Sequence, residues 1–128
     1  MKNKKAVSTT IINIVVITII IAVVMFYISS LTFAPGAPGT NYKAILYHVS
    51  AFFGLSFFLF ITIIQGRKKK FLIFPIIMAL LYAFSDELHQ FLVPGRAASL
   101  GDIFLDFIGI ALAFSLYSVL LVYRKNHL

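Results

Sequence analysis

Polar and ionisable side chains gather in one short part of an otherwise apolar sequence. All four acidic residues lie between positions 86 and 106, in the segment SDELHQFLVPGR at 85–96 and just after it. The residues concerned are Asp86, Glu87, His89, Gln90, Arg96, Asp102 and Asp106. Carboxylates and imidazoles can bind a divalent cation, transfer a proton or accept hydrogen bonds from a polar ligand. The pattern therefore predicts a binding or catalytic site.

The composition indicates the environment of this cluster. Of the 128 residues, 61% are hydrophobic and 12% are charged, and the mean hydropathy is +1.00. A small soluble domain must cover much of its surface with polar groups, and this chain has too few of them. We therefore expect an integral membrane protein, with residues 1–128 forming a single domain.

Four apolar stretches are long enough to cross a bilayer, whose hydrocarbon core of about 30 Å requires roughly 20 residues per helix. The predicted spans are residues 8–31, 44–64, 71–93 and 102–123. The third stretch is apolar only to Phe84, so it reaches spanning length only if the helix continues through the polar segment. The expected fold class is all-α, an integral membrane bundle of four transmembrane helices.

Turn and capping signals support the boundaries of the spans. Two Pro-Gly pairs, at 35–36 and 38–39, separate the first two spans, and Pro94-Gly95 ends the third. Ser99 and Asp102 have the spacing of a capping box, with Ser99 as the N-cap of the fourth helix. The carboxylate of Asp102 would also meet the positive end of the helix dipole.

The basic residues predict the orientation of the bundle. Nine of the eleven lysines and arginines would lie on one side of a four-helix topology, with only Lys43 and Arg96 on the other. By the positive-inside rule, both termini are cytoplasmic and the polar cluster faces outward. Basic residues that flank apolar runs do not form a nucleic-acid-binding patch, so we expect no nucleic-acid partner. A cleaved signal at the N-terminus is an alternative, but the apolar run is long for one and lacks a clear cleavage site.

Helical periodicity makes one half of the third helix end polar. At 100° per residue, its polar side chains spread over about 160° of the helix surface. They are Asp86, Glu87, His89 and Gln90. The third and fourth spans are antiparallel and joined by a short loop, so the acids of both should lie at a similar depth in the outer part of the membrane.

The fourth helix carries two acids and two small residues on one face. A stripe about 60° wide contains Asp102, Asp106, Gly109 and Ala113. Small residues four positions apart let helix backbones approach closely in lipid, so we predict that Gly109 and Ala113 pack against a neighbouring helix. That contact would turn Asp106 inward. Its candidate partners are His48, which lies about one turn into the second span at the same depth, His89 and Arg96.

The cluster resembles the signature of a known family. The pattern Asp86-Glu87-x-x-Gln90, Pro94-Gly95-Arg96 and Asp102-x-x-x-Asp106-x-x-Gly109 is similar to that of the VanZ-like family of small polytopic membrane proteins. His48 is similar to a histidine that follows the first loop of that family, although many members have Asn at the position of Asp106. The resemblance covers about residues 29–113. It implies a cell-envelope protein, and founding members are associated with low-level resistance to teicoplanin-type lipoglycopeptides.

Our first functional hypothesis is an outward-facing site in the cytoplasmic membrane that binds a lipid or lipid-like amphiphile. The planar fork of Arg96 suits a phosphate or carboxylate, and the acids suit hydroxyl or amine groups. The predicted ligand-binding residues are Asp86, Glu87, Gln90, Arg96, Asp102 and Asp106. The expected partner is a membrane lipid or a lipid-linked small molecule, and a homo-oligomer stays an open alternative.

A second hypothesis is a membrane enzyme that acts on a lipid-linked envelope substrate, by a divalent metal or by acid-base catalysis. The candidate catalytic residues are Glu87, Asp86, His89 and His48, and the candidate metal ligands are Asp86, His89, Asp102 and Asp106. The sequence has no cysteine, no HExxH and no GxSxG motif, so a divalent metal is the one cofactor that we consider. A small transporter ranks third, because four helices without an inverted repeat would have to oligomerise.

Overall fold

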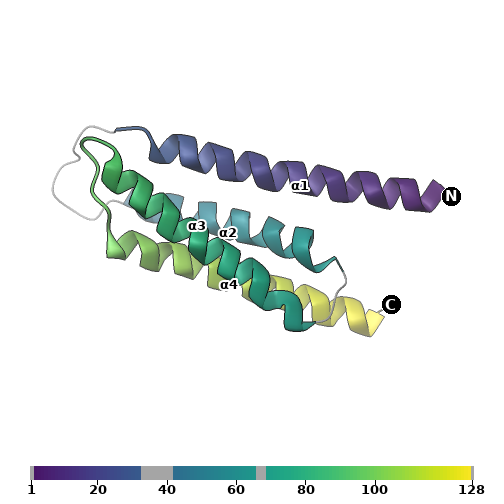
Figure 1. The fold of residues 1–128 in the computed structure, drawn as a ribbon. Coiled ribbons are helices and arrows are strands. Elements are labelled where there is room, and N and C mark those ends of the chain that lie inside the picture. Colours follow the sequence, from purple (N-terminus) through teal and green to yellow (C-terminus); the bar gives the residue numbers. More distant parts are fainter. Residues whose placement is uncertain (1, 33–41, 66–68, 128) are drawn as a thin grey trace.

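The protein is a bundle of four long helices (Figure 1). A computed structural model describes residues 2–32, 42–65 and 69–127. The elements are α1 (Lys2–Ser29), α2 (Tyr42–Ile64), a short 3-10 helix η1 (Lys69–Leu72), α3 (Ile73–Leu92) and α4 (Leu100–His127). All four α-helices are long and apolar enough to cross a membrane. The expected all-α fold class with four membrane-spanning helices is therefore confirmed, whereas the assignment of residues 1–128 to a single domain stays a prediction.

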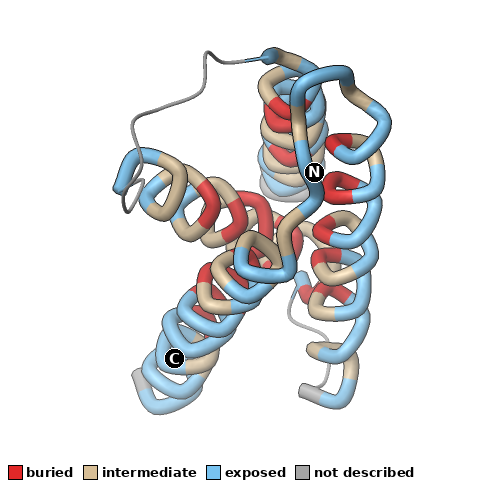
Figure 2. Tube along the Cα trace, turned by 90° about the vertical axis from the view of Figure 1, so that its left-hand side faces the viewer, coloured by how far each residue is buried: buried red, intermediate tan, exposed pale blue. Residues whose placement is uncertain are grey.

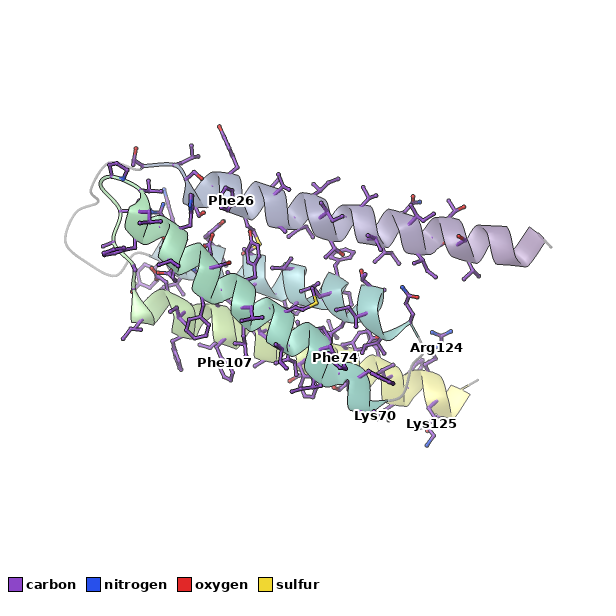
Figure 3. The ribbon with its side chains drawn as sticks, viewed as in Figure 1. Phe26, Lys70, Phe74, Phe107, Arg124 and Lys125 are labelled. Atoms are coloured by element: carbon purple, nitrogen blue, oxygen red, sulfur yellow. The ribbon has the colours of Figure 1, made fainter. Side chains whose placement is uncertain are left out.

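The two ends of the bundle differ in charge. Both chain termini lie at one end (Figure 1), and Lys70, Arg124 and Lys125 lie at this end as well (Figure 3). The opposite end contains the last turns of α3 and the first turns of α4, which carry all four acids. This separation of charge is the pattern on which the positive-inside rule operates. The cytoplasmic location of the termini stays a prediction.

Buried residues lie on the sides of the helices that face the other helices, and exposed residues lie on the outer sides (Figure 2). Phe52, Phe60 and Ile64 of α2 have no exposed surface, and the ring of Phe60 stacks on Tyr117 of α4 with their centroids 5.4 Å apart. Large apolar side chains such as Phe107 lie on the outer faces (Figure 3). An apolar outer face is what a helix in contact with lipid requires.

A glycine sets the close approach of α2 and α4. A Cβ atom at Gly109 would lie 2.5 Å from the carbonyl oxygen of Val49 and 2.9 Å from the backbone nitrogen of Phe53. Ala113, one turn further along α4, is fully buried in a cluster with side chains of α2. Both predicted packing residues therefore lie against α2. The close approach also brings the acids of α4 to α2.

A tight turn after α3 returns the chain toward α4. Pro94 and Gly95 occupy its two central positions, and the backbone nitrogen of Arg96 donates to the carbonyl oxygen of Val93 over 3.1 Å. Gly95 has φ of 81°, in the left-handed region that glycine adopts without strain. The turn places Arg96 beside the end of α1, where its Nη1 donates to the carbonyl oxygen of Leu31 over 3.0 Å.

Polar contacts attach α1 to the other helices. The hydroxyl of Tyr82 in α3 donates to the carbonyl oxygen of Ala22 over 2.6 Å. The hydroxyl oxygens of Thr18 in α1 and Thr62 in α2 lie 3.1 Å apart. Because apolar surfaces gain little by leaving lipid for protein, such hydrogen bonds and close packing hold membrane helices together.

Candidate functional site

A buried histidine–carboxylate pair joins α2 to α4. Nδ1 of His48 lies 2.8 Å from Oδ1 of Asp106, and the two residues are 3% and 0% exposed. Because a carboxylate accepts hydrogen bonds, Nδ1 donates, and a neutral imidazole then keeps its lone pair on Nε2. The hydrogen bond thus fixes both the orientation of the ring and its tautomer.

Two more carboxylates lie close to the same ring, one of them on its Nε2 side. Nε2 of His48 is 3.9 Å from Oδ2 of Asp102, and one ligand atom each from His48, Glu87 and Asp102 lies within 4.8 Å of the other two. The three side chains come from α2, α3 and α4. Together with Asp106 they form a group that we name the His48 centre.

The start of α4 explains how Glu87 is held. The hydroxyl of Ser99 accepts from the backbone nitrogen of Asp102 over 3.3 Å, so Ser99 is the N-cap as predicted. The reciprocal half of the expected capping box is wrong, because the backbone nitrogen of Ser99 donates to Oε2 of Glu87 over 2.8 Å. In a capping box the side chain at the third helical position, here Asp102, would accept this hydrogen bond. Glu87 of α3 accepts it instead. Asp102 is thereby left to face His48.

A second group, which we name the Arg96 network, lies beside the His48 centre. The guanidinium of Arg96 donates to Oε1 of Gln90, whose Nε2 donates to Oδ2 of Asp86 over 2.9 Å. Asp86 is 3% exposed and Gln90 is 2% exposed. Arg96 also bonds to Leu31, so the network runs from the end of α1 to the interior of the bundle.

His89 faces α1 and not the His48 centre. Its Nε2 lies 2.9 Å from the hydroxyl oxygen of Ser30, and its ring stacks on Phe26 with their centroids 4.3 Å apart. Phe26 is on α1, toward the end of the bundle opposite Lys70, Arg124 and Lys125 (Figure 3). These contacts account for His89 as a residue that packs α3 against α1.

The six predicted ligand-binding residues therefore divide between two neighbouring groups. Glu87, Asp102 and Asp106 belong to the His48 centre, and Asp86, Gln90 and Arg96 form the Arg96 network.

The four predicted metal ligands do not form one group in the part of the chain that the structure describes. Among those residues, the group with metal-ligand spacing combines Asp102 with His48 and Glu87, and it omits the expected Asp86, His89 and Asp106. Asp86 instead bonds to Gln90, and His89 bonds to Ser30 beside α1, so these two side chains of α3 meet different neighbours. Sequence reasoning also missed the backbone nitrogen of Ser99, although the N-cap position was a signal that this amide required an acceptor.

The charge of the His48 centre determines its chemistry. Three carboxylates surround one imidazole, and intramembrane ionisable groups are costly unless they are paired or functional. An arrangement of this kind can accept a proton, bind a cation or accept hydrogen bonds from a polar ligand.

Comparison with known proteins identifies the family. No curated protein and no solved structure gives a significant match to the chain. The VanZ/LLP1 family model matches residues 2–122, a range that includes every residue of the His48 centre and of the Arg96 network. The chain, a membrane protein with four apolar helices, therefore belongs to the VanZ/LLP1 family.

Proposed function

We propose that this protein binds the polar headgroup of a membrane lipid or lipid-like amphiphile at the end of the bundle that carries the acids, opposite the chain termini. This end would lie on the outer side of the cytoplasmic membrane. One observation carries the proposal. Three buried acids each have an oxygen without a hydrogen-bond partner among the described residues, namely Oδ1 of Asp86, Oε1 of Glu87 and Oδ2 of Asp106. A buried unpaired acceptor costs about 1–3 kcal/mol. Donor groups of a bound molecule would remove that cost.

The chemistry of the two groups indicates the class of headgroup. The unpaired carboxylate oxygens suit hydroxyl or amine donors, and the guanidinium of Arg96 beside them suits a phosphate or carboxylate. On the outer face of α3, Leu88 and Phe91 are 63% and 66% exposed. The acyl chain of a bound molecule would lie along that face. Lipoglycopeptides share these chemical features, so a role in teicoplanin-type resistance belongs to the same proposal.

The test is native mass spectrometry of the protein purified from bacterial membranes in mild detergent. Wild-type protein should retain one lipid or amphiphile class at about one molecule per chain. Asp86→Asn and Arg96→Lys should lose it, because each keeps the size of the side chain and removes the carboxylate or the planar fork. The control is Lys125→Gln, which removes a positive charge at the other end of the bundle. Equal loss in the control, or no retained class in wild type, would contradict the proposal.

The His48 centre favours a second candidate function, acid-base catalysis on a lipid-linked envelope substrate. A histidine whose Nδ1 donates to a buried carboxylate presents its Nε2 as a general base, and here Asp106 supplies that carboxylate at 2.8 Å. The test is to incubate the protein in liposomes with lipid-linked saccharides and lipid phosphates and to analyse the products by mass spectrometry. Turnover that is lost in His48→Gln and kept in His89→Gln would support this function. No turnover in wild type would reject it.

A further inference from the structure

Three side chains of the His48 centre have the chemistry of a metal site. We infer that His48, Glu87 and Asp102 bind one divalent cation of the zinc or manganese type between α2, α3 and α4. This inference goes beyond the proposed function, because a cation is a second kind of ligand and would satisfy Glu87 in place of a donor group of the amphiphile.

The distances between the donor atoms fit one ion. Ligand atoms that each lie about 2.1 Å from a zinc ion are at most about 4.2 Å from one another. The separation of 3.9 Å between Nε2 of His48 and Oδ2 of Asp102 is within that limit. The complete set, with Glu87, lies within 4.8 Å, so a small adjustment of side-chain rotamers would close the site.

Glu87 provides an independent indication of a missing ligand. The residue is 3% exposed, and Ser99 holds its Oε2 at 2.8 Å, whereas its Oε1 has no partner in the described part of the chain. The carboxylate is therefore fixed at one oxygen and unsatisfied at the other. A cation would satisfy a buried carboxylate that lies in one group with a second carboxylate and an imidazole nitrogen.

Asp106 acts as the outer shell of the site. Histidines that bind metals usually donate their other ring nitrogen to a carboxylate or carbonyl oxygen, which orients the ring and makes the ligating nitrogen more basic. Nδ1 of His48 has this contact with Asp106, and both residues are buried. The ring is thus already held as a ligand.

The donor set selects the type of ion. The imidazole nitrogen suits Zn²⁺ and the two carboxylates suit Zn²⁺ or Mn²⁺, whereas Ca²⁺ takes six to eight oxygen ligands and Mg²⁺ prefers oxygen throughout. Three protein ligands also leave coordination positions open, as in catalytic zinc sites. Such positions would accept water or a polar group of a bound molecule.

The experiment measures metal binding to the whole chain. Protein purified in detergent is stripped with a chelator, dialysed, and titrated with Zn²⁺ or Mn²⁺ by calorimetry, and bound metal is counted by elemental analysis. Wild type should bind one ion per chain. Glu87→Gln and Asp102→Asn should lose stoichiometric binding, and Asp106→Asn should bind about 10- to 100-fold more weakly, as outer-shell changes do. X-ray absorption of the zinc form should show one imidazole ligand that His48→Gln removes.

Matched controls separate a site from general loss of charge or of folding. Asp86→Asn removes the acid next to Glu87, and His89→Gln removes the histidine that packs on α1; both should bind metal as wild type does. Circular dichroism establishes that each variant is folded. If Glu87→Gln does not fold, Asp102→Asn tests the site instead, because Asp102 is partly exposed in the first turn of α4. No binding by wild type, or equal weakening in the controls, would overturn the inference. Metal binding without lipid retention would leave it standing and reject the headgroup proposal alone.

Discussion

Substitution of Gly109 by alanine should separate α2 from α4 and break the His48 centre. The new Cβ atom would lie 2.5 Å from the carbonyl oxygen of Val49, about 1 Å closer than an ordinary contact allows. Both obstructing atoms nearest to it belong to the α2 backbone, which cannot rotate away as a side chain can. The helices must therefore move apart. The hydrogen bond from His48 to Asp106, 2.8 Å long and one turn away, would exceed bonding distance.

The magnitude follows from three contributions. Overpacking of a helix contact costs about 1–3 kcal/mol, and loss of a hydrogen bond to a charged group costs about 1.5–3 kcal/mol. Replacing a helical glycine with alanine returns about 1 kcal/mol through backbone propensity. Together these contributions lower the free energy of unfolding of Gly109→Ala by about 1.5–5 kcal/mol.

Gly54→Ala is the matched control, because no atom beyond its own stretch of helix lies within 4 Å of the position where its Cβ would be. The same gain in helix propensity applies, so this variant should be unchanged or more stable by up to about 1 kcal/mol. The assay is reversible unfolding in mixed detergent micelles, followed by circular dichroism, with ¹⁵N spectra of the histidine rings as a local probe. Equal stability of the two variants, or an unchanged His48 resonance in Gly109→Ala, would refute the reasoning.

Two further substitutions test the elements that surround the site. Gly95→Ala should lower stability by about 1–2 kcal/mol in thermal unfolding, because an L residue is strained at φ of 81°; an unchanged midpoint would show that the turn adapts. Tyr82→Phe should cost about 1 kcal/mol and speed hydrogen exchange in α1, since it removes the 2.6 Å bond to Ala22. Tyr27→Phe is the control, as Tyr27 is 65% exposed, and equal exchange in both variants would contradict the role of Tyr82.

The four helices could be predicted because the bilayer fixes the length and the apolar composition of a span. The chain ends α3 where Pro94-Gly95 signals an end and begins α4 after the N-cap Ser99. The start of α3 was less accessible to sequence reasoning. Residues 69–72 form the 3-10 helix η1, and α3 begins at Ile73, two residues later than expected. Local propensity carries no strong signal for such a short 3-10 segment.

The direction of a site residue can be predicted where the polar and small residues of a helix share one narrow face. The narrow stripe on α4 predicts that Gly109 packs against a neighbouring helix and that Asp106 turns inward. In the structure Gly109 lies against α2 and Asp106 bonds to His48. On α3 the polar side chains spread over about 160°, and the partner that each one meets depends on which helices flank α3. His89 meets α1 while Glu87 meets α4, and nothing in the pattern of a single helix states the order of its neighbours.

The adjacency of Asp86 and Glu87 has a physical consequence for the whole site. Successive side chains on a helix point about 100° apart, so the two carboxylates cannot serve the same group. Asp86 connects through Gln90 and Arg96 to the end of α1, whereas Glu87 connects through Ser99 to the start of α4. A cation in the His48 centre would satisfy Glu87, and a headgroup at the Arg96 network would satisfy Asp86. The last turns of α3 would instead join the two sites, because a shift of that helix end on binding at one must move the neighbouring acid at the other.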